Sequence, residues 1–227
     1  MSFAGAAGLL FDPASDPTNG GDMRLTLTTF LTLDGVMQAP GGPSEDPSGG
    51  FEHGGWLVPH ADAEMGRFMD EVFAEADAFL LGRRTYDIFA AHWPRVTDPD
   101  DPIAGKLNRL PKFVPSQSLD EAAWSGTTLL KGDVAEEVAE LKRKPGRELQ
   151  VHGSGALART LMRHGLIDEY RLLTFPVMLG TGRKLFADDL APAALRLLKA
   201  VTTTTGISIA VYETAGAPTY GTFELAS

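Results

Sequence analysis

The stretch LQVHGSGALARTLMRHGLIDEYRLLTFP, residues 149–176, carries the strongest indication of the fold class. Its first residues, Leu149–His152, predict a strand, and Ala156–His164 predict a helix that ends at Gly165. Glu169–Pro176 predict a second strand. A strand, a helix and another strand in this order are typical of a mostly parallel β-sheet that is covered by helices.

The residues that precede this stretch continue the alternation. Arg24–Leu33 alternate Leu and Thr, which predicts a strand. The segment Asp34–Pro59 is rich in Gly and Pro, and loops of such length are usually either functional or disordered. Ala61–Ala76 predict a helix, because their apolar residues recur at helical spacing. A short strand over Ala78–Leu81 leads into a second helix, and His92–Gly105 are expected to form a polar loop.

The remaining elements complete a single α/β domain. Lys112–Pro115 and Thr127–Leu130 predict short strands, and Gly132–Lys144 predict an amphipathic helix. The β-rich runs Leu195–Thr204 and Ile207–Glu213 predict an antiparallel hairpin. The sequence therefore predicts a mixed, mostly parallel sheet with helices on both faces and an antiparallel hairpin at its C-terminal edge.

Composition limits the classes of function. The 227 residues are 43% hydrophobic and 22% charged, enough apolar sequence for a real core. A net charge of −10 argues against a nucleic-acid partner, which needs a basic surface. The absence of cysteine excludes disulfides, a thiolate nucleophile and a cysteine-ligated zinc site. The histidines lack metal-ligand spacing, so no metal is expected either.

The ends of the chain are expected to lie outside the domain. Residues 1–22 have neither a basic region nor an uninterrupted apolar run of the secretory type, and we expect a loose extension there. The domain itself is expected over residues 23–215, and residues 216–227 form a tail. No apolar run approaches the roughly 18 residues that span a bilayer. We therefore expect a cytoplasmic protein with no membrane partner.

Two motifs each place small or cationic residues between a strand and a helix, where parallel sheets bind their ligands. Gly153-Ser154-Gly155 lets backbone N–H groups approach an anion, although a tight turn without a ligand explains the motif equally well when it stands alone. Gly82-Arg83-Arg84-Thr85 offers two guanidiniums at a helix start. A solvated first turn is the alternative there, but cations at a helix N-terminus oppose the helix dipole and favour an anionic ligand.

A third motif follows the strand that ends near Pro176. Gly180 and Gly182 stand next to the cationic pair Arg183-Lys184, which suggests a loop pressed against a ligand. An ordinary turn whose glycines supply positive φ is an equally good explanation.

Together with further short motifs, these three resemble the dihydrofolate reductase-like superfamily. The closer resemblance is to the reductase domain of the bacterial riboflavin-biosynthesis deaminase-reductase, over about Met23 to Glu213. The motifs that carry the resemblance, in order, are Thr32-Leu33-Asp34-Gly35, Leu80 to Tyr86, His92-Trp93-Pro94, His152 to Leu157, Gly165 to Glu169, and Pro176-Val177-x-Leu179-Gly180-x-Gly182.

The resemblance implies a single domain with a sheet of about eight strands, NADPH as hydride donor, a small-molecule substrate and a homodimer. It implies that the cofactor-binding residues are Gly35, Gly82, Arg83, Arg84, Thr85, Ser116, Gln117, Ser118, Gly153, Ser154, Gly155, Ala156 and Leu157. The implied substrate-binding residues are Asp34, Trp93, Pro176, Gly180 and Gly182. Asp34 is the candidate catalytic residue, expected to orient the substrate or the nicotinamide; an Asx-turn before Gly35 is the structural alternative.

The sequence departs from the family pattern in three places, one of which is the segment Asp34–Pro59, longer and more Gly-rich than usual. Gln117 stands where relatives often have an Arg that holds the adenosine phosphate, which leaves the choice between NADPH and NADH open. The deaminase half is absent, since its zinc chemistry requires H-x-E and P-C-x-x-C.

Three hypotheses of function follow. The first is an NADPH-dependent reductase of the riboflavin-biosynthesis type, acting on a ribosylaminopyrimidine-like substrate. The second is a reductase of the same fold acting on another small molecule, such as a pterin. True dihydrofolate reductases use one buried acid on the first helix to help protonate the pterin. Asp62 and Glu64 are the available acids, although first-turn acids favoured by the helix dipole explain both better. The third is a catalytically silent nucleotide-binding protein.

Overall fold

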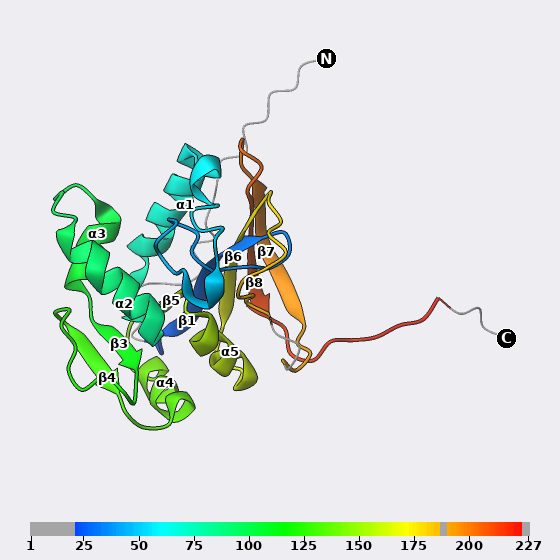
Figure 1. Cartoon of the computed structure of the whole chain (residues 1–227). Helices are drawn as coiled ribbons and strands as arrows, with labels where there is room; N and C mark the ends of the chain where they lie inside the picture. The colour runs from blue at the N-terminus through cyan, green and yellow to red at the C-terminus, as the bar shows by residue number, and fades with distance from the viewer. Residues whose placement is uncertain (1–20, 187–189, 224–227) are drawn as a thin grey trace, which may run out of the picture.

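The computed structural model describes residues 21–186 and 190–223, and it contains one eight-stranded sheet. The strands are β1 Arg24–Thr32, β2 Ala76–Leu80, β3 Lys112–Pro115, β4 Thr127–Leu130, β5 Glu148–His152, β6 Glu169–Phe175, β7 Leu195–Thr202 and β8 Ser208–Thr214. Their order in the sheet is β4-β3-β2-β5-β1-β6-β8-β7 (Figure 1). β1 to β6 pair in parallel, whereas β8 pairs antiparallel with both β6 and β7. The predicted fold class is therefore confirmed, including the C-terminal hairpin.

Helices cover both faces of the sheet, and each face has its own apolar core. The helices are α1 Ala63–Ala74, α2 Arg83–His92, α3 Pro102–Arg109, α4 Val134–Lys142 and α5 Gly155–Arg163. One core contains Phe68 of α1 and Leu107 of α3. The other contains Val138 of α4 and Leu161 of α5, together with Leu25 of β1. Burial of both faces is what a central parallel sheet requires.

The structure corrects one expected element. His92–Gly105, predicted to be a polar loop, instead contain a 3₁₀ turn over Trp93–Arg95 and the start of α3. Asp101 caps α3 by accepting hydrogen bonds from the backbone N–H groups of Ile103 and Ala104. An Asp-Pro pair also occurs in turns, but here it supplies the N-cap and the first residue of a helix.

The long Gly- and Pro-rich segment between β1 and α1 packs against the domain. Its side chains Val36, Phe51 and Trp56 are buried in the core that α1 covers. The indole N–H of Trp56 donates a hydrogen bond of 2.8 Å to the carbonyl of Gln38, which ties the two halves of the segment together. The segment therefore forms a fixed wall beside the carboxyl ends of the strands.

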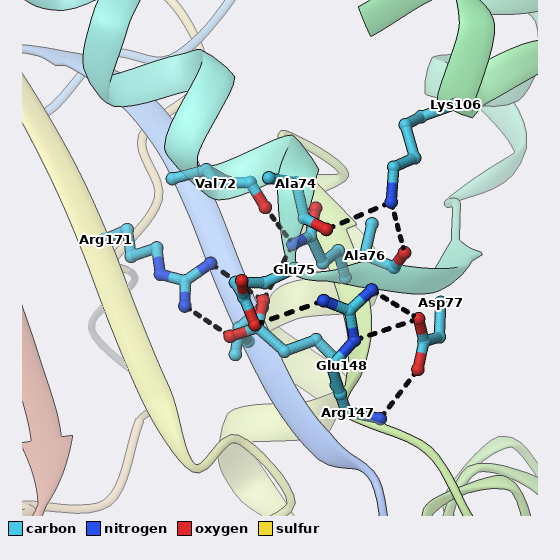
Figure 2. Close-up of polar contacts among 11 residues, drawn as sticks. Val72, Ala74, Glu75, Ala76, Asp77, Lys106, Arg147, Glu148 and Arg171 are labelled. Atoms are coloured by element: carbon cyan, nitrogen blue, oxygen red, sulfur yellow. Dashed lines mark hydrogen bonds and ion pairs between the residues drawn. The ribbon is translucent and has the colours of Figure 1, made fainter. Parts of the chain in front are cut away.

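A buried polar network lies between the sheet and α1. Arg171 of β6 pairs with Glu148 of β5 at 2.5 Å and with Glu169 at 2.6 Å. Gln150 continues the network, because its amide nitrogen donates to Glu148 and to the carbonyl of Val72 in α1. Figure 2 shows Arg171 directed toward Glu148. Buried charges of this kind are tolerated only when they are paired and hydrogen-bonded.

Of the two predicted domain boundaries, the structure bears only on the first, near residue 22. Asp22 forms an isolated antiparallel bridge with Pro145, just before β1 begins. The extension predicted over residues 1–22 lies, up to residue 20, outside the described residues, and the boundary at residue 215 stays a prediction. Among the described helices, none is long and apolar enough to cross a bilayer.

Candidate active site

A cleft of about 830 Å³ opens where the carboxyl ends of β2, β5 and β1 meet. Its walls are the first turns of α2 and α5, the segment between β1 and α1, and α1 itself. The predicted site residues that line it are Gly82, Arg83, Arg84, Thr85, Trp93, Ser118, Gly153, Ser154, Gly155, Ala156 and Leu157. The motifs that begin at Gly82 and at Gly153 therefore face one cavity, although they are far apart in the sequence.

Ser154 joins these two motifs. Its Oγ accepts a hydrogen bond of 2.9 Å from the backbone N–H of Gly82, and its own backbone N–H donates to Thr85 Oγ1 at 3.1 Å. The same hydroxyl donates to the carbonyl of His152. Ser154 adopts a left-handed conformation, with φ 53° and ψ 41°, which is uncommon for a residue other than glycine. The hydrogen bonds on both sides hold the serine in this conformation and fix the spacing of the two turns.

The two helices that begin at the cleft differ from the others in their N-termini. α1, α3 and α4 are each capped by an aspartate side chain, namely Asp62, Asp101 and Asp133. α2 and α5 have no side-chain cap and no acidic residue in the first turn. Their first N–H groups and the positive ends of their dipoles therefore remain available to an anion in the cleft.

Close packing explains a glycine in the second motif. A Cβ atom on Gly155 would lie 2.5 Å from the sulfur of Met37, so a larger residue there would require the Met37 side chain to move. Gly153 has a φ of 55°, in the region that glycine adopts without strain. The glycines thus leave the backbone of this turn without side chains, and the β1–α1 segment lies close beside it.

The other end of the cleft is apolar. Met65 and Met69 of α1 face it, with Phe30 of β1 on the sheet side. Phe89 and Trp93 form the opposite edge, with their rings 6.1 Å apart at 77°. Flat aromatic walls and flexible methionines suit a planar heterocycle. Trp93 was among the predicted substrate-binding residues, but the methionines were not, because their spacing on α1 equally suits a core.

His152 lies at the floor of the cleft as a neutral side chain. Its ring stacks on Phe73 at 4.5 Å, and burial, together with the charge of Arg171, lowers its pKa to about 3. Its Nε2 is 3.0 Å from Gln150 Oε1. Because the Gln150 amide nitrogen already donates elsewhere, Nε2 carries the hydrogen and Nδ1 is left as an acceptor. No group of three acidic or histidine side chains among the described residues is arranged to hold a metal ion.

Asp34 is placed differently from the expectation. Within the described chain, Asp34 and Gly35 lie outside the lining of the cleft. The carboxylate accepts hydrogen bonds from Thr32 Oγ1 at 2.6 Å and from the backbone N–H groups of Leu179 and Gly180 at 3.2 and 2.8 Å. The Thr32 hydroxyl and these N–H groups lower the pKa of Asp34 to about 2. Its contacts are those of an anchor for the loop that follows β6.

That loop and the turn after β3 also contribute less to the cleft than expected. Of the described residues, the members of the predicted site that do not line the cleft are Asp34, Gly35, Ser116, Gln117, Pro176, Gly180 and Gly182. Gly182 is required by packing, since a Cβ there would be 2.7 Å from both Val36 and Phe51. The Gln117 amide donates to the carbonyl of Lys131.

The acids of the first helix are structural. Asp62 caps α1 through the N–H of Met65 and also accepts from Thr205 Oγ1 at 2.8 Å. Glu64 accepts from the N–H of Thr204 at 2.8 Å. Both carboxylates therefore hold the turn between β7 and β8 against α1.

The lining residues that were not predicted as site residues include Asp46, Arg159 and Arg183. Arg183 was noted only as part of a Gly-rich loop, and nothing in the sequence pattern connects Asp46 with it. Their role depends on contacts between segments that are distant in the sequence.

The sheet order, the paired helix N-termini and the cleft between them define the class of this protein, an α/β domain of the dihydrofolate reductase-like fold. Residues 24–209 match the model of the RibD C-terminal domain family, and the chain belongs to that family.

Its relatives agree with this assignment. The uncharacterized protein YyaP of Bacillus subtilis (strain 168) is 27% identical over 191 residues, which are 83% of this chain and 94% of the relative. A putative riboflavin biosynthesis protein from Shewanella sp. PV-4 has the same fold, with a TM-score of 0.64, 22% identity, and coverage of 85% of this chain and 99% of that structure. Dihydrofolate reductase from Enterococcus faecalis, solved with NADP(H), matches with a TM-score of 0.53 and 13% identity over 86% of this chain and 98% of its own.

The contacts of Asp34 predict the behaviour of the Asp34→Asn variant. Asparagine has one acceptor oxygen instead of two, so one loop N–H loses its partner. We expect the free energy of unfolding to fall by about 1 kcal/mol at neutral pH, a small value because the carboxylate is partly exposed. The folded pKa is lowered, so the wild type's advantage is present above pH 3.8 and shrinks as the pH falls toward about 2.

Urea denaturation of both proteins at pH 7 and pH 3 measures this difference. If Asp34 is an anchor, steady-state kcat/KM changes by less than about tenfold. A loss of roughly 10²-fold with unchanged stability, the size typical of a positioned acid–base group, would instead place Asp34 in the catalytic machinery.

Proposed function

We propose that this protein is an NADPH-dependent reductase of the riboflavin-biosynthesis type, which transfers a hydride to a small heterocyclic substrate. The observation that carries the proposal is the pair of uncapped helix N-termini facing one cleft. An anionic group is the ligand that such an arrangement favours, and the apolar chamber beside it provides room for two flat rings.

The cofactor would lie along the carboxyl ends of the strands. Gly82–Thr85 and Gly153–Leu157 would hold its diphosphate through backbone N–H groups. Ser118, which follows β3, lies toward the β4 edge of the sheet and would border the adenosine. Arg83 is the candidate for a 2′-phosphate; its guanidinium, now 2.9 Å from Asp87 in the same helix, would exchange that carboxylate for the phosphate.

The chain's own residues would position the substrate. Bound NADPH would supply the hydride to an electrophilic C=N or C=O carbon of the substrate. Phe30, Met65 and Met69 would enclose the ring and exclude water from it. His152 Nδ1 would accept a hydrogen bond from a donor on the cofactor or substrate. Asp34, in this proposal, acts through the loop that it anchors rather than on the substrate.

The riboflavin-type substrate is favoured over a pterin by the contacts of α1. A reductase of the pterin type would need a buried acid on this helix, facing the cleft. The acids available, Asp62 and Glu64, instead bind the β7–β8 turn, and α1 presents methionines to the cleft. A catalytically silent nucleotide-binding protein remains the other alternative, and turnover separates it from both reductases.

The predicted homodimer and the cytoplasmic location stay predictions. β7 is an edge strand of the sheet and exposes Leu195, Leu197 and Leu198. An apolar edge of this kind is where a second copy would be expected, because exposed edge strands otherwise favour aggregation.

NADPH should stabilise the folded protein against heat. A ligand present at 100 times its dissociation constant adds about 2.7 kcal/mol to the free energy of unfolding. A thermal melt with and without millimolar NADPH measures the effect, and oxidation of NADPH with a panel of ribosylaminopyrimidine and pterin substrates measures turnover. A melting temperature that neither NADPH nor NADH changes would contradict the cofactor assignment, whereas binding without turnover would support the silent binder.

Arg83 should determine the preference for NADPH over NADH. A hydrogen bond to a charged group contributes roughly 1.5–3 kcal/mol, so Arg83→Ala should weaken NADPH binding by about tenfold or more. NADH lacks the 2′-phosphate and should bind the variant nearly as it binds the wild type. Arg143→Ala, which removes a surface charge on the far side of the sheet, is the matched control. Equal losses for the two cofactors would assign Arg83 to the diphosphate instead.

A further inference from the structure

Three guanidiniums from different elements meet at the cleft. Arg84 comes from α2, Arg159 from α5, and Arg183 from the loop after β6. Arg159 donates a hydrogen bond of 3.1 Å to the carbonyl of Lys184, which places it next to Arg183. Burial lowers the pKa of Arg183, the charge of Asp46 raises it, and the nearby charges of Arg84 and Arg159 lower it. The cluster is thus close enough for mutual repulsion in a protein whose net charge is −10.

One carboxylate lies among these cations. Asp46 contacts Arg183 directly and lies 3.7 Å from the Nε of Arg84. Its side chain is only 9% exposed. Neighbouring Glu45 does not join the cluster through any contact seen in the described residues; its carboxylate accepts from the backbone N–H of Gly41 instead. Asp46 is therefore the carboxylate that pairs with this cluster, through Arg183 and Arg84.

The position of Asp46 is fixed from several sides. Gln38 donates to the carbonyls of Asp46 and Ser48 at 3.0 and 2.9 Å, and it accepts from the N–H of Arg183. Arg183 also donates to the Ser48 hydroxyl at 2.8 Å. Asp46 thus connects the β1–α1 segment to both α2 and the loop after β6, across the opening between the two phosphate-binding turns.

A carboxylate and a phosphate compete for the same guanidinium, because each offers two negatively charged oxygens that can accept the parallel N–H groups of its planar fork. A phosphate group carries more negative charge and more acceptor oxygens than a carboxylate. Three guanidiniums are consequently better neutralised by a phosphate than by Asp46.

We propose that Arg84, Arg159 and Arg183 form a binding site for a phosphate ester, and that Asp46 occupies this site until the ligand's phosphate displaces it. This inference deepens the proposed function and rests on it for one source of the phosphate, the cofactor diphosphate. A phosphate carried by the substrate is the other source. On displacement, residues Gly41–Phe51 lose the ion pairs that connect them to α2 and to Arg183.

Isothermal titration calorimetry tests the site with three probes: NADPH, inorganic pyrophosphate, and ribose 5-phosphate added to protein saturated with NADP⁺. Asp46→Asn removes the competing charge, and we expect it to tighten binding of the relevant phosphate by about tenfold. Arg159→Gln and Arg183→Gln should weaken the same binding by about tenfold each. Asp70→Asn and Arg143→Gln, which change the same charges on exposed helix surfaces, should have no effect. Thermal melts of the free variants establish that each one folds.

The probes identify the source of the phosphate. Competition between pyrophosphate and NADPH, with both sensitive to Arg183→Gln, assigns the site to the cofactor diphosphate. Binding of ribose 5-phosphate to the NADP⁺-saturated protein, lost in Arg183→Gln, assigns it to the substrate. Weaker binding of every probe by folded Asp46→Asn would overturn the proposal, as would unchanged binding in both arginine variants. If NADPH fails to bind while pyrophosphate binding still depends on Arg183, the proposed function fails and the phosphate site stands.

Discussion

The hydrogen bonds of Ser154 are the constraint on which the site depends. They join the turn after β5 to the turn after β2, and these two strands are neighbours in the sheet. Parallel pairing brings the two turns to the same edge, but only the serine fixes how far apart the helix starts lie. The left-handed backbone of Ser154 is tolerated because three hydrogen bonds hold it. Two uncapped helices thereby point into a single cleft.

The sheet beneath the cleft is held by charge as well as by apolar packing. Arg171, Glu148 and Gln150 form a continuous polar network that ends at His152, on the cleft floor. Through Gln150, the ion pair of the central strands therefore helps to fix the orientation of the His152 ring in the site. Arg147, next to Glu148 in the chain, makes a second set of contacts, including one of 2.8 Å with Asp77 of β2 (Figure 2). These contacts lie at the amino ends of the strands, away from the cleft.

Much of this fold could be predicted because its signals are local. The β-strands and the helices α1, α4 and α5 follow apolar periodicity and glycine stops, and the two phosphate motifs are contiguous in the sequence. α3 was missed because its Asp101-Pro102 start is also a turn signal. The roles of Asp34 and Asp46 could not be predicted, since each depends on partners that the chain brings together only on folding, Leu179 and Gly180 for the first and Arg183 for the second.

The central claim, that the uncapped starts of α2 and α5 bind the phosphates of a nicotinamide cofactor, is tested most directly by NMR. Backbone amide signals of the isotope-labelled protein are followed during titration with NADPH. We expect the amide signals of Arg84, Thr85, Ala156 and Leu157 to shift most. The signals of the first-turn amides of α3 and α4, which are capped by aspartates, should not shift. Saturable binding that leaves those four amides unshifted would contradict the claim.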